Sequence, residues 1–147
     1  MGSSYIFVKE ILFMKNLKVF ISQPMNGRKE IDVLLERRVA ITLLNDKGFD
    51  KYELEEIDNY HKTNIPTTAG RVYYLGDSVR QMDEADLVIF VKGWKGAKGC
   101  EIEYAICKIY GIPYVLMEEL CEPSYKIDNT LYDIRKYRVD RGRRKID

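Results

Sequence analysis

Two carboxylates, Glu101 and Glu103, stand at the start of a predicted helix that follows a glycine-rich turn. The three glycines between residues 93 and 99 let the backbone bend sharply and approach a ligand closely. Before them, Leu87–Val91 is five apolar residues in a row, which is typical of a strand covered on both faces. Open parallel sheets bind ligands at the carboxyl ends of their strands, beside helix N-termini. The pattern therefore indicates a site where a carboxylate acts on a bound small molecule.

The residue spacing allows only one of these two acids to face inward. Positions two apart on a helix point about 200° away from each other, at roughly 3.6 residues per turn. Acids in a first helical turn also stabilise the helix dipole without any other role. The apolar positions of the same helix do not decide which acid faces inward; they are Ile102, Ala105, Ile106 and Ile109.

A second strand–loop–helix unit lies near the N-terminus. Leu17–Ser22 predicts a short strand, and an amphipathic helix is predicted from about residue 29 to residue 47, with Gly48 ending it. The apolar positions of this helix recur at helical spacing; they are Ile31, Leu34, Leu35, Val39, Leu43 and Leu44.

The loop QPMNGR joins this strand to this helix. Its proline, asparagine and glycine are ordinary turn residues. The same loop could instead cradle a phosphate or a sugar at the helix N-terminus, with Ser22, Asn26 and Arg28 as donors. The pattern leaves both interpretations open, because the loop matches no known nucleotide-binding fingerprint.

The middle of the chain combines a weak element, a long loop and a helix. Residues 50–57 predict a weak strand or a short helix, and residues 58–71 form a loop that carries the only histidine, His61. A lone histidine without a partner motif is more typical of the surface than of a catalyst. Tyr73–Glu84 predicts a helix, and Asp77 near its start either stabilises the dipole or serves a site. The residues expected to face inward from this helix are Val72, Leu75, Val79 and Met82.

The alternation of strands and helices predicts the fold class. Ile112–Met117 is a further apolar strand, and right-handed crossovers between such units produce a parallel sheet. We expect an α/β fold: a single Rossmann-like or flavodoxin-like domain, with a parallel sheet of about five strands and helices on both faces. The domain should span residues 14–122, after a leader or N-terminal extension at 1–13. A basic, aromatic tail at 123–147 should pack on the domain or on a partner subunit.

Composition narrows the classes of function. The chain has 147 residues, with Lys+Arg 24, Asp+Glu 23 and a net charge of +1, so there is no overall signal for a polyanionic partner. Seven basic residues lie between Arg135 and Lys145, but a short mixed-charge tail is more often solvated or in contact with a subunit than bound to nucleic acid. No apolar run approaches the roughly 18 residues of a membrane span. The three cysteines lack metal-ligand spacing, which indicates reduced thiols in a cytoplasmic protein and implies no metal and no cofactor.

Three segments resemble the nucleoside 2-deoxyribosyltransferase-like superfamily; they are LKVFISQPMNG, YYLGDSVRQMDEADLVIFVKGW and GCEIEYAICKIYGIPY. The resemblance covers about Leu17 to Met117 and is nearest to the nucleoside 5′-monophosphate N-glycosidases of the CMP type. Its most specific element is Gly99 followed by Glu103. The resemblance implies that Glu103 is the nucleophile that attacks or stabilises C1′ of the sugar as the base leaves. It also implies a homodimer or larger assembly whose subunits share active sites.

The resemblance nominates Asp77 as the second catalytic acid, which handles protons on the leaving base or on the attacking water. Asp77 lies one residue out of the family register relative to Asp86, and Ser78 occupies the strictly spaced position. A family serine or acid six residues before the nucleophile is Ala97 here. The residues expected to bind the substrate are Ser22, Gln23, Met25, Asn26, Gly27, Arg28, Ser78, Lys98 and Gly99.

These features predict a hydrolase that cleaves the N-glycosidic bond of a nucleoside 5′-monophosphate, of the CMP or hydroxymethyl-CMP type. The products would be the free base and (deoxy)ribose 5-phosphate. A phosphate is expected because the SQPMNGR loop and Lys98-Gly99 offer donors for it. An alternative enzyme is a nucleoside 2-deoxyribosyltransferase, which uses free nucleosides. An alternative of another class is a non-catalytic nucleotide-binding module. The differences from the family pattern at Ala97 and Asp77 favour this alternative.

Overall fold

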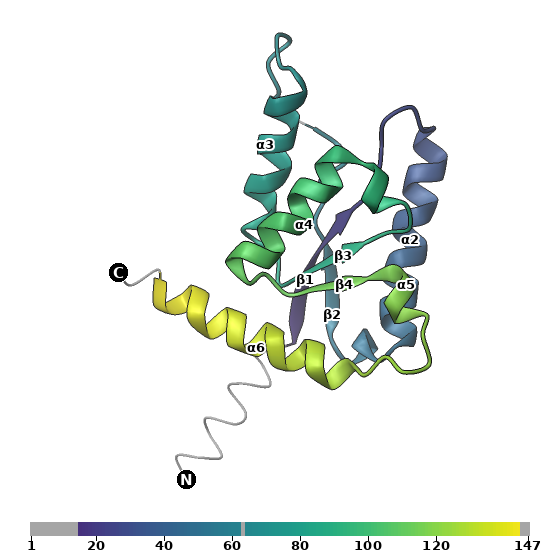
Figure 1. Cartoon of the computed structure of the whole chain (residues 1–147), viewed down its shortest axis with the longest axis vertical. Helices are drawn as coiled ribbons and strands as arrows, with labels where there is room; N and C mark the ends of the chain where they lie inside the picture. Colours follow the sequence, from purple (N-terminus) through teal and green to yellow (C-terminus); the bar gives the residue numbers. More distant parts are fainter. Residues whose placement is uncertain (1–14, 63, 145–147) are drawn as a thin grey trace.

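The computed structural model describes residues 15–62 and 64–144, and the predicted leader at 1–13 lies outside them. Strands and helices alternate along the described chain (Figure 1). In chain order the elements are β1 (Asn16–Ser22), α2 (Glu30–Asp46), η1 (Phe49–Lys51), β2 (Glu53–Glu56), α3 (Arg71–Met82), β3 (Leu87–Phe90), η2 (Trp94–Gly96), α4 (Lys98–Tyr110), β4 (Tyr114–Leu116), α5 (Met117–Leu120) and α6 (Ile127–Arg144).

The sheet is parallel throughout its described strands and has the order β2-β1-β3-β4. This is the Rossmann-like α/β arrangement that the alternation predicted. The expected count of about five strands was too high: the described residues form a sheet of four. The chain passes directly from β4 into α5 and then into α6, so the residues after Leu116 are used for helices.

Helices cover both faces of the sheet because neighbouring strand residues point to opposite faces. On one face, Leu17, Val19 and Ile21 of β1 join a buried cluster with residues of α2, α5 and α6. On the other face, Phe20 and Phe90 join a cluster with residues of α3 and α4. In Figure 1, α3 and α4 lie on one side of the strands, while α2 and α5 lie toward the other.

The first helix has the predicted extent but not the expected inner face. Gly48 follows it with φ of +115°, the left-handed backbone that ends helices and that glycine adopts without strain. The residues of α2 that are buried are Val33, Arg37, Ala40 and Leu44. Four of the predicted apolar positions are instead exposed; they are Ile31, Leu34, Leu35 and Val39. The inner face was missed because it contains an arginine and an alanine, which no hydrophobic pattern marks.

The same kind of error affects α3 and α4. Val72 was expected to face inward and is 82% exposed, because it lies in the first turn of α3, beyond the cover of the sheet. Met82, at the other end of that helix, is buried as expected. On α4, Ile102 and Ile109 are exposed, while the buried residues are Cys100, Glu103 and Cys107.

Helix α6, within the segment expected to pack on the domain or on a partner subunit, contributes residues to the core. Leu131 and Ile134 of α6 are buried against the sheet. Arg138 is also buried and pairs with Asp86 at the start of β3, with Nη2 2.7 Å from Oδ2. Arg138 also donates to the Asn16 carbonyl, so α6 is tied to the amino ends of two neighbouring strands. Figure 1 shows α6 lying across that end of the sheet.

Candidate active site at the carboxyl edge of the sheet

A hydrogen bond between Ser22 and Glu103 lies at the point where the strand order reverses. Ser22 ends β1 and is in register with Phe90, the last residue of β3. The chain leaves β1 toward β2 on one side, and β3 lies on the other side. Open α/β sheets bind ligands in the crevice that forms at this topological switch point. There the Ser22 hydroxyl donates to Glu103 Oε1 at 2.8 Å.

Glu103 is a buried carboxyl, and its neighbour in the pair of acids is not. Its residue is 5% exposed, whereas Glu101 lies on the exposed face of α4. Cys100 and Cys107, one turn before and one turn after, share its inward stripe. Burial raises the pKa of Glu103 to about 7, although the Ser22 hydrogen bond and the charge of Lys62 act in the opposite direction. The carboxyl can therefore gain or lose a proton near neutral pH.

The two cysteines beside Glu103 are poor nucleophiles. Burial raises the pKa of the Cys100 thiol to about 11 and that of Cys107 to about 12. Because the thiolate is the reactive form, both behave as small apolar residues at neutral pH. The group of this stripe that titrates near neutral pH is the carboxyl of Glu103.

Asp77 lies in a cluster of charges on α3. Lys62 Nζ is 3.1 Å from Asp77 Oδ2 and donates to Ser78 Oγ at 2.9 Å. Arg80 donates to Asp77 Oδ1 at 2.8 Å. The hydrogen bond from Arg80, with the one from Lys62, holds the pKa of Asp77 below its usual range. Asp77 is therefore anionic at neutral pH and can accept hydrogen bonds, while its lowered pKa makes it a weak base.

Lys62 links this cluster to the buried carboxyl. Its side chain is 15% exposed, and its charge is close enough to lower the pKa of Glu103. Sequence reasoning missed Lys62, since it lies in the long loop before α3 and belongs to no motif. The only usable signal was the length of that loop, which suggested a functional segment.

Two predicted substrate-binding residues of the N-terminal loop, Gln23 and Arg28, form hydrogen bonds with residues of α2. Gln23 Nε2 donates to the Val33 carbonyl at 2.9 Å and to Glu36 Oε1 at 2.8 Å. Arg28 Nη1 donates to the same Glu36 oxygen at 2.7 Å and to the Pro24 carbonyl at 2.9 Å. Gln23 is thus a structural residue of the loop, and the charge of Arg28 is offset by Glu36.

The other loop residues lie farther from the central pair. Met25 is half-buried, whereas Asn26 and Gly27 are exposed. Gly27 has φ of +73°, so it serves the turn itself. No hydrogen bond or ion pair between described residues joins these three to Glu103.

Lys98 and Gly99 form the first turn of α4, one turn before Glu103. The first backbone N–H groups of a helix have no partner within the helix and attract anions. Lys98 is exposed, and a side chain at Gly99 would meet Leu75 of α3 at 4.0 Å. The N-terminal end of α4, which carries the positive end of the helix dipole, therefore lies next to α3 and follows the glycine turn.

Several other features of the described chain lie apart from the Ser22–Glu103 pair. No cluster of three metal-ligating side chains occurs within residues 15–62 and 64–144. None of the helices in that part of the chain is long and apolar enough to cross a membrane.

His61 lies on the surface beside Asp58, with Nδ1 2.9 Å from Oδ2. A groove of about 670 Å³ lies at the opposite edge of the sheet, between the end of α4 and α6, and no predicted site residue lines it.

Comparisons with known proteins do not assign this site. No family model matches the sequence, and no curated protein matches it. A solved structure that is similar to this chain is that of a conserved protein from Enterococcus faecalis V583, with a TM-score of 0.49 and 14% sequence identity. The alignment covers 81% of this chain and 86% of that chain.

Proposed function

We propose that the protein hydrolyses the N-glycosidic bond of a nucleoside 5′-monophosphate, with Glu103 as the nucleophile. The observation that carries this proposal is the Glu103 carboxyl, which is buried, held by Ser22 and placed at the topological switch point. Breaking an N-glycosidic bond creates positive charge at C1′ of the sugar. A carboxylate in a dry site stabilises that charge strongly or traps the carbon covalently.

The reaction proceeds in two steps. The Glu103 carboxylate bonds to C1′ while the C1′–N bond breaks, and the electron pair leaves with the base, which takes up a proton from solvent. A water molecule then attacks C1′ as the bond between C1′ and Glu103 breaks; the electron pair returns to the carboxylate, and the water gives up its proton to solvent. Asp77 is anionic and its lowered pKa makes it a weak base, so its place in this scheme is to accept a hydrogen bond from that water or from the sugar.

The substrate class follows from two positive groups near Glu103. The first turn of α4, with Lys98, is a place for a 5′-phosphate. Lys62 is a second cation close to the carboxyl. By resemblance, a pyrimidine nucleotide of the CMP or hydroxymethyl-CMP type is the first substrate to test.

The test is a panel of ribonucleotides, deoxyribonucleotides and free nucleosides, with base release followed by chromatography. The proposal predicts release of a base from at least one monophosphate in buffer alone. If a base appears only when a free nucleoside and an acceptor base are both present, hydrolysis of monophosphates is ruled out.

That second outcome would identify a nucleoside 2-deoxyribosyltransferase, which one observation favours. Glu36 offsets the charge of Arg28, and Glu30 and Asp32 lie in the first turn of α2. The β1 loop is therefore less suited to a phosphate than its sequence suggested. A non-catalytic nucleotide-binding module would instead be stabilised thermally by nucleotides and would yield no product from any member of the panel.

A further inference from the structure

A buried arginine, Arg37, lies behind the residues that hold the Glu103 carboxyl. It comes from the inner face of α2 and is 3% exposed. Burying a guanidinium costs several kcal/mol unless hydrogen bonds and a counter-charge compensate it. Alanine and leucine pack the same face of α2 on the sheet at neighbouring positions. Packing alone therefore does not explain why an arginine is buried at position 37.

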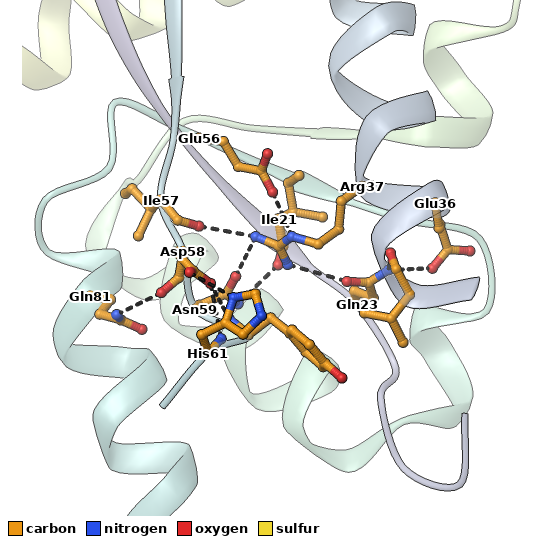
Figure 2. Close-up of polar contacts among 12 residues, drawn as sticks. Ile21, Gln23, Glu36, Arg37, Glu56, Ile57, Asp58, Asn59, His61 and Gln81 are labelled. Carbon is orange, nitrogen blue, oxygen red and sulfur yellow. Dashed lines mark hydrogen bonds and ion pairs between the residues drawn. The ribbon is translucent and has the colours of Figure 1, made fainter. Parts of the chain in front are cut away.

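Arg37 donates four hydrogen bonds, all toward the carboxyl ends of β1 and β2 (Figure 2). Nε donates to Glu56 Oε1 at 2.5 Å, which supplies the counter-charge. Nη2 donates to the Ile57 carbonyl at 3.0 Å and to Asn59 Oδ1 at 2.7 Å. Nη1 donates to Gln23 Oε1 at 3.2 Å. The planar guanidinium thus joins the segment after β1 to the segment after β2.

Both neighbours of Ser22 in the chain are held by this network. The Ile21 carbonyl accepts a hydrogen bond from Asn59 Nδ2 at 3.1 Å, and the other end of that amide is held by the arginine. The Gln23 side chain accepts from the arginine directly. Ser22 lies between these two anchors, and its hydroxyl is the hydrogen-bond donor to the site carboxyl.

We propose that Arg37 is a positioning residue that fixes Ser22 against the Glu103 carboxyl, through Gln23 on one side and Asn59 on the other. This inference rests on the proposed function for its catalytic meaning, but the contact chain can be tested without turnover. Losing the guanidinium removes one hydrogen bond from each anchor, at Gln23 Oε1 and at Asn59 Oδ1, so the end of β1 is held less firmly on its β2 side. A shift of about 1 Å at such a site can cost on the order of 100-fold in rate.

The readout is the protonation of Glu103, which depends on the Ser22 hydrogen bond. The other group that acts on this carboxyl is the Lys62 cation, and the charge of the carboxyl in turn raises the pKa of the thiols of Cys100 and Cys107 on the same helix. None of these three is a partner of Arg37 in the network, so they remain in place when the arginine is replaced.

The experiment compares Arg37→Met with two control variants in the full chain. Arg38→Met removes the exposed arginine next in sequence, and Leu44→Ala destabilises the same face of α2 without touching the network. Carboxyl ¹³C NMR titration gives the pKa of Glu103, whose signal is identified by its absence in Glu103→Gln. Asn59→Ala is a second test variant that removes only the anchor on Ile21.

We expect the pKa of Glu103 to rise by at least about 0.5 pH unit in Arg37→Met, because the carboxylate loses a hydrogen bond that favours its charged form. Asn59→Ala should change it in the same direction, and both controls should leave it unchanged. If Arg37→Met does not fold, the pKa of Glu103 in Asn59→Ala is the measurement that tests the inference. A folded test variant with the wild-type pKa would overturn the inference, as would an equal rise in Leu44→Ala.

Steady-state kinetics separate this inference from the proposed function. If the wild type turns over nucleotides, Arg37→Met should lose kcat about tenfold or more with little change in KM, since the arginine does not reach the ligand. If no substrate turns over, the proposed function fails, and the titration alone still decides whether Arg37 positions Ser22.

Discussion

At the scale of single residues, the choice between Glu101 and Glu103 was decided by burial. The two acids are equivalent in sequence, yet one is exposed and the other lies between two buried thiols. The apolar pattern of α4 could not predict this, because its bulky isoleucines lie outward and its small cysteines lie inward. The glycine-to-glutamate spacing of the family resemblance selected the acid that is buried.

The buried carboxyl makes a prediction about stability and pH. The ordinary pKa of 4.5 rises to about 7 in the folded protein, so the folded chain keeps a proton that the unfolded chain loses between these values. The free energy of unfolding should therefore fall as pH rises from about 4.5 to about 7, by at most about 3 kcal/mol from this group. Glu103→Gln should remove that part of the pH dependence, as measured by thermal unfolding between pH 5 and pH 8. The matched variant Glu101→Gln should behave as wild type, and an unchanged slope in Glu103→Gln would contradict the assignment.

A second residue-scale prediction concerns Ser22. Its hydroxyl favours the charged form of Glu103, so Ser22→Ala should raise the pKa of the carboxyl further. If the carboxylate is the nucleophile, the alkaline plateau of the pH–rate profile should then begin at a higher pH. Loss of a hydrogen bond to a charged group should lower kcat by roughly 10- to 100-fold. A profile identical to that of wild type would mean that the hydrogen bond has no part in catalysis.

At the scale of elements, the order of β1, α2, α3, β3, α4 and β4 followed from the sequence, whereas α5, α6 and the inner faces of the helices did not. Runs of apolar residues located β1, β3 and β4, and Gly48 and Gly111 mark the ends of helices with positive φ. On α2 the inner face carries Arg37, whose partners come from β2 and from the segments after β1 and after β2. Such a network joins residues that are distant in sequence, so no local pattern could reveal it.

The pairing of α6 with β3 makes a prediction at this scale. Burial raises the pKa of Asp86, but hydrogen bonds from Arg138 and the Lys18 amide outweigh it and hold that pKa below its ordinary value. Asp86→Asn should cost about 3–5 kcal/mol at neutral pH, because it removes the buried carboxylate with which Arg138 pairs. The pairing is fully present above the ordinary pKa of 3.8 and is lost as pH falls through the folded value, so the difference from wild type should shrink in acid. Denaturant unfolding of Asp86→Asn against the exposed control Asp83→Asn measures it, and equal stabilities would show that α6 is held by apolar contacts alone.

At the scale of the whole molecule, the four-stranded order places the ends of β1 and β3 side by side, which explains where the site lies. Residues from four segments meet there: β1, the loop with Lys62, α3 and α4. The sequence predicted the β1, α3 and α4 contributions through their motifs. It did not predict Lys62 or Arg37, since their roles arise only when the loops fold over the sheet edge.

The resemblance also predicts how copies of the chain assemble. We expect a homodimer or larger assembly in which subunits share active sites. Light scattering at micromolar concentration should therefore give at least twice the mass of one chain. A single-chain mass at concentrations where the enzyme is active would show that each site is complete within one subunit.

The most direct test of the account is base release from CMP and dCMP by the wild type, Glu103→Gln and Glu101→Gln. Wild type and Glu101→Gln should release cytosine at similar rates, and Glu103→Gln should be at least about 100-fold slower while still binding the nucleotide. Fluorescence of Trp94, the single tryptophan, which lies in the turn before α4, can follow that binding. Release of cytosine by Glu103→Gln at the wild-type rate, or its loss in Glu101→Gln instead, would contradict the central claim that Glu103 is the nucleophile.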